Sequence, residues 1–265
     1  MRIGIVGCAG RMGRMLMNAV LEAEGCTLAG GTERPGADAV GRDVGELLGR
    51  GTLGATVESD AKRLFEQADA VIDFTAPAAT VLHASLAAEC RKVLVVGTTG
   101  LTDDDEAQLR AAADRTPIVY APNFSVGVNL LMALVEQAAA VLASDYDIEI
   151  VEMHHRHKVD SPSGTALGLG RAAAKGRGIP LDKVWRKVRD GHTGARPRGE
   201  IGFATLRGGD VVGDHTVMFA SEGERVELTH KASSRSVFAK GAVRAAQWAH
   251  GKPPGLYTMR DVLGL

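Results

Sequence analysis

The sequence predicts an α/β protein with a Rossmann-type, doubly wound parallel sheet, followed by a second α+β domain with a mixed sheet. Three observations lead to this prediction. Up to about residue 122, short apolar runs alternate with turns and helical stretches, as in a parallel sheet with crossover helices. A glycine-rich turn joins the first apolar run to the first helical stretch. Beyond Pro122, one long Ala/Leu/Val-rich helical segment precedes strand-like segments that come in neighbouring pairs.

The first domain is expected at residues 1–125. Its strands should be short apolar runs buried on both faces of the sheet, at residues 2–6, 27–32, 70–74, 93–97 and 117–120. Helices are expected between them, at residues 11–23, 78–90 and 103–114. The last of these begins after Thr102, whose hydroxyl can cap the first turn, and acidic residues follow where the helix dipole favours them.

The second domain is expected at residues 126–235, with helices at 126–143 and 164–175. Its strands are predicted at 147–153, 200–207, 212–220 and 225–230, with Glu222-Gly223 turning the last hairpin. Segment 177–198 is rich in Gly, Arg, Lys and Pro and has little periodicity, so it is expected to be a surface or an active-site loop. A final helix at 236–250 and the remaining tail, residues 236–265 together, are expected to pack back on the first domain.

Composition excludes several classes of function. The formal net charge is −1, so no global field attracts nucleic acid or anionic membranes, and neither is expected as a partner. Cys8, Cys26 and Cys90 show no CxxC spacing, which favours free thiols in a reducing compartment and hence the cytoplasm. No apolar stretch of about 18 residues and no signal-peptide pattern is present, so a secreted or membrane-spanning protein is not expected.

The turn at Gly7, Gly10 and Gly13 predicts a dinucleotide site. It follows the first strand and opens the first helix, where a tight turn lets pyrophosphate approach the free N–H groups of the helix. Glu33 ends the second strand about 20 residues later, where an acidic residue binds ribose hydroxyls. Arg34 follows and can neutralise a 2′-phosphate. The sequence therefore predicts NADH, NADPH or both as cofactor.

Further loops follow the carboxyl ends of later strands, where a doubly wound sheet places its ligands. Residues 74–77 and 97–100 are small or hydroxylated and can bring backbone amides close to the nicotinamide end of the cofactor, although simple turn chemistry explains them as well. Residues 121–124 form a similar junction that also looks like a hinge into the second domain.

The run His154-His155-Arg156-His157-Lys158 is the least ordinary stretch of the sequence. If the preceding strand continued through it, His154, Arg156 and Lys158 would share one face and the other two histidines would share the opposite face. Clustered cations lower one another's pKa values, which moves such groups toward proton transfer near neutral pH. A proton donor is therefore expected here.

A helix start follows this run directly. In residues 160–166, Ser or Asp can cap the helix while Gly164 and Thr165 present backbone N–H groups, which bind carboxylates and phosphates. Together with the cations, this turn predicts a small substrate that carries at least one carboxylate.

Three histidines in four residues also raise the alternatives of a zinc site and of a solvated basic loop. No metal is expected, because neighbouring Arg and Lys side chains would repel a divalent ion and no carboxylate or cysteine has supporting spacing. The position between a strand and a capped helix argues against a plain basic loop.

At these motifs the chain resembles the 4-hydroxy-tetrahydrodipicolinate reductase family, or dihydrodipicolinate reductases, of bacterial diaminopimelate and lysine synthesis. The resemblance covers nearly the whole chain. It is carried by GxxGRMG at 7–13, GTTG at 97–100, APNFSVGVN at 121–129 and EMHHRHKVDSPSGTA at 152–166, of which the last two are highly specific.

The resemblance implies roles for individual residues and a homotetramer assembled through the substrate-domain sheets. His154 and Lys158 would be the catalytic acid/base pair, His155 would contact the substrate, and Gly164 with Thr165 would bind a substrate carboxylate. The implied cofactor-binding residues are Gly7, Cys8, Ala9, Gly10, Arg11, Met12, Glu33, Arg34, Gly97, Thr98, Thr99, Ala121, Pro122, Asn123 and Phe124. A side chain larger than that of Cys8 is expected to crowd the pyrophosphate.

The implied function is reduction of 4-hydroxy-tetrahydrodipicolinate to tetrahydrodipicolinate by NADH or NADPH. Two alternatives differ in class. One is another two-domain dehydrogenase of a small carboxylated substrate; a thioester route is poorly supported because all three cysteines lie in the first 90 residues. The other is a non-catalytic dinucleotide sensor, which would have no need of paired proton donors beside an anion site.

Overall fold

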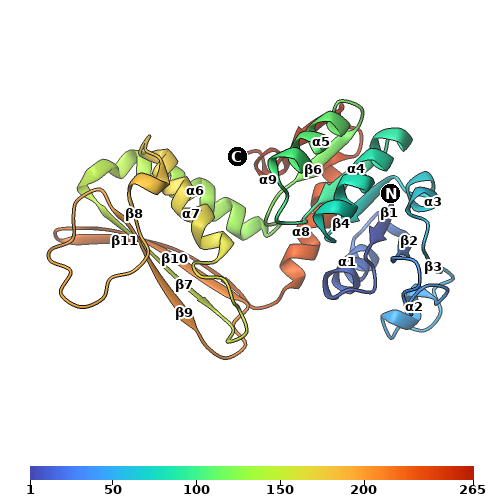
Figure 1. Ribbon diagram of the computed structural model, residues 1–265, viewed down its shortest axis with the longest axis horizontal. Coiled ribbons are helices and arrows are strands. Elements are labelled where there is room, and N and C mark those ends of the chain that lie inside the picture. The colour runs from blue at the N-terminus through green and yellow to red at the C-terminus, as the bar shows by residue number, and fades with distance from the viewer. The chain divides into compact units, whose positions relative to one another are not determined.

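The computed structural model describes residues 1–265, with the exception of the side chain of Ala143. The chain forms two compact units. Unit 1 comprises Met1–Val126 and Ser236–Gly264, and unit 2 comprises Gly127–Arg235 together with Leu265. Figure 1 labels the helices and strands of both units.

Unit 1 is built on a seven-stranded sheet in which all paired strands run parallel. In spatial order the strands are β12 (Gly255–Tyr257), β6 (Pro117–Tyr120), β5 (Val93–Val96), β4 (Ala70–Asp73), β1 (Arg2–Val6), β2 (Thr27–Thr32) and β3 (Val57–Glu58). The chain order reverses between the neighbours β1 and β4, and doubly wound sheets bind ligands outside the carboxyl ends of strands at such a point. The predicted doubly wound sheet is confirmed.

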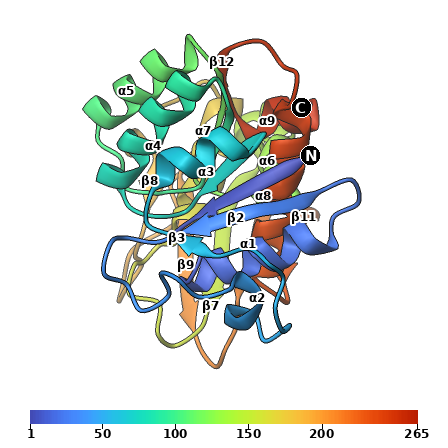
Figure 2. The ribbon, with the colours of Figure 1, turned by 90° about the vertical axis from the view of Figure 1, so that its right-hand side faces the viewer.

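Helices cover both faces of this sheet, as Figure 2 shows. Residues of α1 (Arg11–Glu22), α2 (Val44–Leu47), α8 (Ser236–Ala249) and α9 (Met259–Leu263) enter one core, and those of α3 (Ala61–Gln67), α4 (Pro77–Cys90) and α5 (Asp103–Ala113) enter the other. Because successive side chains of a strand point to opposite faces, each strand contributes to both cores. Ile72 and Val95 pack into the first core, and Val71 and Leu94 pack into the second. Apolar residues on both faces of the strands therefore hold the sheet between two helical layers.

Unit 2 contains a five-stranded mixed sheet with helices on one face. In spatial order its strands are β11 (Glu224–Ala232), β10 (Gly213–Ser221), β7 (Asp147–His154), β9 (Ile201–Arg207) and β8 (Trp185–Arg186). Strand β10 runs antiparallel to β7 and β11, whereas β9 runs parallel to β7 and β8. Helices α6 (Val126–Leu142) and α7 (Gly164–Gly176) pack into the same core as the sheet. The predicted mixed sheet is confirmed, including the hairpin turn at Glu222-Gly223 between β10 and β11.

The period-two pattern of β7 continues beyond its apolar residues. Ile148, Ile150, Glu152 and His154 are all buried, while the residues between them are partly exposed. Since alternate side chains of a strand share a face, the carboxylate and the imidazole lie on the same helix-covered face as the two isoleucines. This places two polar groups at the end of the unit 2 core.

Most predicted elements are observed with ends shifted by one or two residues, but several short ones were missed. Residues between β2 and β4 contain α2, β3 and α3, and the tail contains β12 and α9. Segment 177–198 contains a 3₁₀ turn, Leu181–Lys183, and the short strand β8; a further 3₁₀ turn, Ala143–Asp145, follows α6. These pieces span two to seven residues, too few for a helical or strand period to repeat often enough to be recognised. Among the described residues, no helix is both long and apolar enough to cross a membrane.

Candidate active site

The turn between β1 and α1 is shaped by glycines. Gly7 has φ +65°, which other residues rarely adopt, and a Cβ on Gly13 would lie 2.2 Å from the Gly7 carbonyl oxygen. Gly10 is the N-cap of α1 and makes no side-chain capping bond. The first N–H groups of a helix have no acceptor within the helix, so this bare helix start can receive an anion.

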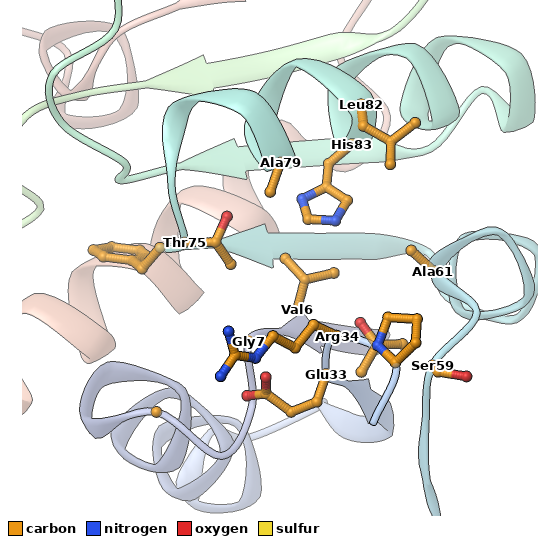
Figure 3. Close-up of a pocket in the computed structure, with 14 residues that line it drawn as sticks. Val6, Gly7, Glu33, Arg34, Ser59, Ala61, Thr75, Ala79, Leu82 and His83 are labelled. Carbon is orange, nitrogen blue, oxygen red and sulfur yellow. The ribbon is translucent and has the colours of Figure 1, made fainter. Parts of the chain in front are cut away.

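A cavity of about 490 Å³ opens next to this turn. Figure 3 shows Glu33 and Arg34 near Gly7, with His83 and Ala79 of α4 on the other side of Val6. The cavity is lined by Val6, Gly7, Gly10, Thr32, Glu33, Arg34, Pro35, Ser59, Ala61, Phe74, Thr75, Ala79, Leu82 and His83. The Oε1 atom of Glu33 accepts a hydrogen bond from the Ala9 N–H at 2.9 Å, so the predicted acidic residue is held against the turn.

The side chain of Cys8 lies in the core beneath the turn. It is fully buried, and a Cβ on Gly31 would lie 2.6 Å from the Cys8 Cβ. Burial raises the pKa of the thiol to about 12, with the nearby Glu33 charge as the next cause. The expectation that a larger residue would crowd the pyrophosphate is wrong, because this side chain points into the core and a larger one would meet Gly31 instead.

The loops after β4 and β5 are joined by a buried carboxylate at the end of β4. Asp73 accepts from the Thr75 N–H at 2.9 Å and from the Thr75 hydroxyl at 2.6 Å, and Thr98 Oγ1 lies 3.3 Å from the same oxygen. Its other oxygen is 2.8 Å from Nδ1 of His83. The Thr98 hydroxyl also receives bonds from Thr75 N–H and from Thr80 Oγ1. This network fixes the predicted loop 97–100 relative to the cavity wall.

The remaining predicted cofactor residues surround the carboxyl ends of β1, β5 and β6. Ala121 and Phe124 are buried, and the Phe124 ring lies 5.5 Å from that of Phe74. A Cβ on Gly97 would lie 2.2 Å from the Phe74 ring, so glycine is required there for packing. The other members are exposed or half-buried: Ala9, Arg11, Met12, Thr99, Pro122 and Asn123. The structure thus gathers the predicted set within unit 1, but only Gly7, Gly10, Glu33 and Arg34 line the cavity. The other predicted residues lie outside its lining: Cys8, Ala9, Arg11, Met12, Gly97, Thr98, Thr99 and residues 121–124.

In unit 2, Glu152 is the centre of a buried polar cluster. Its Oε2 lies 2.5 Å from Nδ1 of His154, and its Oε1 accepts from the Ser163 N–H at 3.0 Å. Arg207 donates to both carboxylate oxygens, at 2.8 and 3.1 Å. His215 packs its ring edge-on against His154, with centroids 5.1 Å apart. All four side chains reach this point because β7, β9 and β10 pair in register there: Glu152 faces His215 and His154 faces Arg207.

Strand β7 ends at His154, so the predicted alternation does not continue to Lys158. The Lys158 N–H donates to the His155 carbonyl at 3.1 Å and the Arg156 N–H to the Gly209 carbonyl, which closes a turn. The condition for His154, Arg156 and Lys158 to share a face is therefore not met, because the backbone leaves the sheet after His154. Lys158 is half-buried and its ammonium lies 2.8 Å from Asp160 Oδ1.

His155 lies next to Arg235, whose NH2 is 3.0 Å from the His155 Nε2. Burial lowers the pKa of His155, and the charges of Arg235 and His154 lower it further. The imidazole is therefore neutral near pH 7 and can accept a hydrogen bond. The expectation that clustered cations lower pKa values holds for this residue, although burial is the larger cause.

The start of α7 is organised by its N-cap, Ser163, whose Oγ accepts from the Ala166 N–H at 3.1 Å. The predicted serine cap is confirmed. Gly164 is exposed, and a Cβ built on it would meet no atom within 4 Å. Backbone at the start of this helix is therefore open to a ligand. Within the described part of the chain, no group of three or more His, Cys, Asp or Glu residues could hold a metal ion.

Both parts of the chain match models of one family. Residues 1–124 match dihydrodipicolinate reductase, N-terminus, and residues 127–263 match dihydrodipicolinate reductase, C-terminus. The chain belongs to the dihydrodipicolinate reductase family. The resemblance inferred from its motifs is confirmed.

Relatives of this family cover the whole chain. The 4-hydroxy-tetrahydrodipicolinate reductase of Sinorhizobium fredii is 58% identical and covers 100% of this chain and 98% of its own length. That of Dinoroseobacter shibae is 57% identical, with 99% and 98% covered. The dipicolinate-bound dihydrodipicolinate reductase from Paenisporosarcina has a TM-score of 0.76 at 25% identity, with 97% of both chains covered.

Dihydrodipicolinate reductases use NADH or NADPH, and the residues of unit 1 fit such a cofactor. The helix start at Gly10 has no capping side chain, and Gly13 packs closely on the Gly7 carbonyl oxygen. The adjoining cavity presents one carboxylate and one guanidinium, from Glu33 and Arg34, to a ribose or its phosphate.

Motif reasoning missed Glu152, Arg207 and His215 in unit 2, and Asp73 with His83 in unit 1. Only Glu152 left a signal: it occupies the apolar face in the alternating pattern Ile148, Ile150, Glu152. A carboxylate at a core position requires hydrogen-bond partners. Those partners come from distant segments, so the pattern alone does not identify them.

Proposed function

We propose that this chain reduces 4-hydroxy-tetrahydrodipicolinate to tetrahydrodipicolinate with NADH or NADPH, in the route to diaminopimelate and lysine. The observation that carries the proposal is in unit 2, where His154 and the loop with Lys158 immediately precede the capped, open start of α7. This combination suits a substrate that needs both a proton and a carboxylate-binding helix start. The names of the relatives and the dicarboxylate in the Paenisporosarcina structure support the same substrate class.

In unit 1, Gly7–Met12 would receive the cofactor pyrophosphate on the backbone N–H groups of α1. Glu33 would accept hydrogen bonds from ribose hydroxyls, and Arg34 would pair with a 2′-phosphate where one is present. Residues 97–99 and 121–124 would border the nicotinamide end. Reduced nicotinamide supplies a hydride when it is bound; the residues of this chain bind, orient and protonate.

In unit 2, the N–H groups of Gly164 and Thr165 would hold a substrate carboxylate, and His155 would contact the substrate as a neutral hydrogen-bond partner. Loss of the substrate 4-hydroxyl consumes a proton as water leaves. His154 and Lys158 would be the acid/base pair that provides it. Residues 1–125 would act as the dinucleotide-binding domain and residues 126–235 as the substrate-binding domain.

The chain is further proposed to act in the cytoplasm as a homotetramer assembled through the sheets of unit 2. The face of this sheet opposite α6 and α7 supports the assembly, since β9 carries exposed Leu206 there, paired with partly exposed Met153 of β7. An exposed apolar sheet face is a common interface between subunits.

The test is reduction of enzymatically generated substrate by purified protein, followed through the absorbance of NADH or NADPH. Lys158→Ala should lose about 10²-fold or more of kcat, because a positioned proton donor typically contributes that much, and should still bind NADH. Lys175→Ala is the matched control: its exposed ion pair with Glu136 should be nearly neutral. Unchanged turnover in Lys158→Ala would remove this lysine from the mechanism, and no reduction by the unaltered protein would refute the proposed function.

A further inference from the structure

We propose that Glu152 is a positioning residue: it binds Nδ1 of His154 and thereby leaves Nε2 as the atom that exchanges a proton with the substrate. This inference rests on the proposed function in assigning the proton transfer to His154. Neither the motifs nor the names of the relatives assign a role to Glu152.

The carboxylate and the imidazole are placed by the strand itself. Glu152 and His154 are two residues apart on β7, so their side chains share the covered face, and the Oε2 to Nδ1 distance is 2.5 Å. Glu152 is 1% exposed and His154 is 8% exposed. Water is therefore excluded from the carboxylate and does not compete for this hydrogen bond.

The other partners of Glu152 keep it ionised. Arg207 donates to both oxygens and is itself held by the Asp160 carbonyl at 2.7 Å, while the Ser163 N–H donates to Oε1. Burial raises the pKa of Glu152, but the hydrogen bonds from Arg207 and His154 outweigh it, so the pKa lies below its ordinary value. An ionised carboxylate has no hydrogen to donate, so the bond to His154 must be an Nδ1–H donating to Oε2.

The edge of the His154 ring that carries Nε2 lies next to Gly213 of β10. A Cβ on Gly213 would lie 3.0 Å from Nε2, closer than an ordinary contact. Glycine at this position of β10 keeps the strand backbone next to Nε2 without a side chain over it. In the neutral ring, Nε2 is therefore the nitrogen without a hydrogen, and no side chain at position 213 covers it.

His215 packs against His154 without competing for its proton. Burial, followed by the charge of His154, lowers the pKa of His215 to about 4, so this ring is neutral throughout the physiological range. Its Nε2 lies 3.2 Å from the Ser163 hydroxyl. Because that hydroxyl already accepts from the Ala166 N–H, its hydrogen can point to His215. The second histidine is therefore a neutral support for the cluster.

The same carboxylate links the imidazole to the substrate-binding helix start, since it binds the N–H of the N-cap residue Ser163. Glu152 thus fixes two elements of the proposed site with one side chain. In Glu152→Gln the amide oxygen can still accept from Ser163, but the amide NH₂ cannot accept from an Nδ1–H. This substitution should therefore disturb His154 more than the helix start.

Several titratable or charged groups face this cluster and contribute to any pH dependence. They are Arg207 on β9, His215 on β10, His230 on β11, and His155, His157, Lys158, Asp160 and Arg235 in the adjoining loops. A control must therefore keep this set unchanged. Glu149→Gln does so, because Glu149 is on the same strand but pairs with Arg189 and Arg196 instead.

The first experiment needs no substrate, so its outcome does not depend on whether the proposed reaction is right. Long-range ¹H–¹⁵N spectra of the full-length protein, with histidines labelled and His154 assigned by difference from His154→Gln, report which ring nitrogen carries the hydrogen. We expect the neutral ring to carry it on Nδ1 in the unaltered protein and in Glu149→Gln. A hydrogen on Nε2 in the unaltered protein would overturn the proposal.

The second experiment measures kcat and kcat/KM against pH for Glu152→Gln and Glu149→Gln. We expect kcat to fall about 10- to 100-fold in Glu152→Gln, as when an orienting partner is removed, with a smaller change in KM. Loss of the carboxylate should also change the pH profile, because it removes an ionised group in direct contact with the proposed proton donor. A thermal melt and an NADH titration establish that the variant is folded.

A folded Glu152→Gln with the pH profile and kcat of Glu149→Gln would contradict the positioning role. Failure of the unaltered protein to reduce the substrate would instead refute the proposed function and leave the spectrum as the test of the Nδ1 bond.

Discussion

Helices α1 and α7 each begin at a proposed ligand site, but their N-termini are built in opposite ways. Helix α1 starts at Gly10, which makes no side-chain cap, and its first turn packs through Gly13 on bare backbone. Helix α7 starts at Ser163, whose hydroxyl caps Ala166 and whose N–H is held by Glu152. The proposed site at α1 depends on residues that have no side chain, whereas the proposed site at α7 depends on side chains that hold the backbone in place.

The difference determines what each site tolerates. At Gly13 of α1 no atom can be added without displacing the turn backbone, and a phosphate-binding turn requires a close approach of backbone. At α7 there is open space beside Gly164, but the site depends on partners from three strands. We therefore expect Gly13→Ala at α1 to destabilise the fold through a steric clash. At α7, Ser163→Ala should act through a lost hydrogen bond, and Gly164→Ala should hinder the ligand without disturbing the fold. Four predictions test this contrast, in decreasing order of their effect on stability.

Gly13→Ala should have the largest effect. The new Cβ would lie 2.2 Å from the Gly7 carbonyl oxygen and 2.6 Å from the Cys8 Cα, so the turn must open. Unit 1 should lose about 3 kcal/mol of unfolding free energy, and NADH affinity should fall with it. Urea unfolding and a fluorescence titration with NADH measure the two effects.

Gly10→Ala is the matched control for this first prediction. Its Cβ would meet only the Gly7 oxygen, at 3.3 Å, and the stability change should stay below about 1 kcal/mol. Equal stability losses in the two variants would contradict steric exclusion at Gly13.

Each unit contains a carboxylate–histidine pair, which is Asp73–His83 in unit 1 and Glu152–His154 in unit 2. Asp73→Asn tests how these two pairs differ. Asp73 is fully buried and neutral threonine donors surround it, without an arginine. The variant should lose about 2 kcal/mol because buried donors lose their charged acceptor. Since Asp73 holds loops and exchanges no proton, kcat should change far less than in Glu152→Gln.

The contribution of Asp73 to the free energy of unfolding should depend on pH. Burial raises its pKa, but the hydrogen bonds from His83 and the threonines lower it more, so the folded value lies below the ordinary 3.8. A lowered carboxyl pKa contributes stability that is complete above the unfolded value and is lost as pH falls through the folded value. The difference in urea unfolding free energy between the two proteins should therefore narrow below about pH 4. If this difference in unfolding free energy stayed at its full size down to about pH 2, the lowered pKa of Asp73 would be contradicted.

Ser163→Ala should cost about 1 kcal/mol through loss of the α7 cap. It should also raise the KM for the substrate, because the cap organises the backbone that is proposed to bind the carboxylate. Thr102→Ala removes the capping box of α5 in unit 1 and is the matched control. It should lower the free energy of unfolding by a similar amount, which thermal unfolding measures. If both variants changed KM equally, the effect would reflect general stability and not the α7 site.

Gly164→Ala should have the smallest effect on stability. No atom lies within 4 Å of the new Cβ, so the fold should be unchanged or more stable by about 0.5 kcal/mol. The methyl group would nevertheless occupy the open side of the helix start, so KM should rise while NADH affinity stays unchanged. A wild-type KM would show that the substrate carboxylate binds elsewhere.

The local features of both sites were predictable from the sequence. The glycine turn before α1, Glu33 at the end of β2, the Thr102 cap and the Ser163 cap all depend on residues near one another in the chain. Strand β7 was also predictable from its alternation, up to the residue at which it leaves the sheet. The turn after His154 was not, because it is closed by hydrogen bonds to residues 209 and 211 of another segment.

The polar clusters were not predictable because sheet register assembles them. Arg207 is 55 residues from Glu152, and His215 is 52 residues from Ser163. Nothing in the local pattern of β9 or β10 shows which residue will face Glu152. The short elements between β2 and β4 were missed for a different reason: in α3, only Leu64 and Phe65 are buried, too few to mark a helical period.

The most direct test of the two proposed helix-start sites is a crystal structure of the full-length protein with NADH and a pyridine dicarboxylate. We expect one carboxylate to accept hydrogen bonds from the Gly164 and Thr165 N–H groups at about 3 Å, beside His154, with the cofactor pyrophosphate on the turn at Gly7–Met12. A dicarboxylate bound without contact to the start of α7, or a pyrophosphate away from the start of α1, would contradict it.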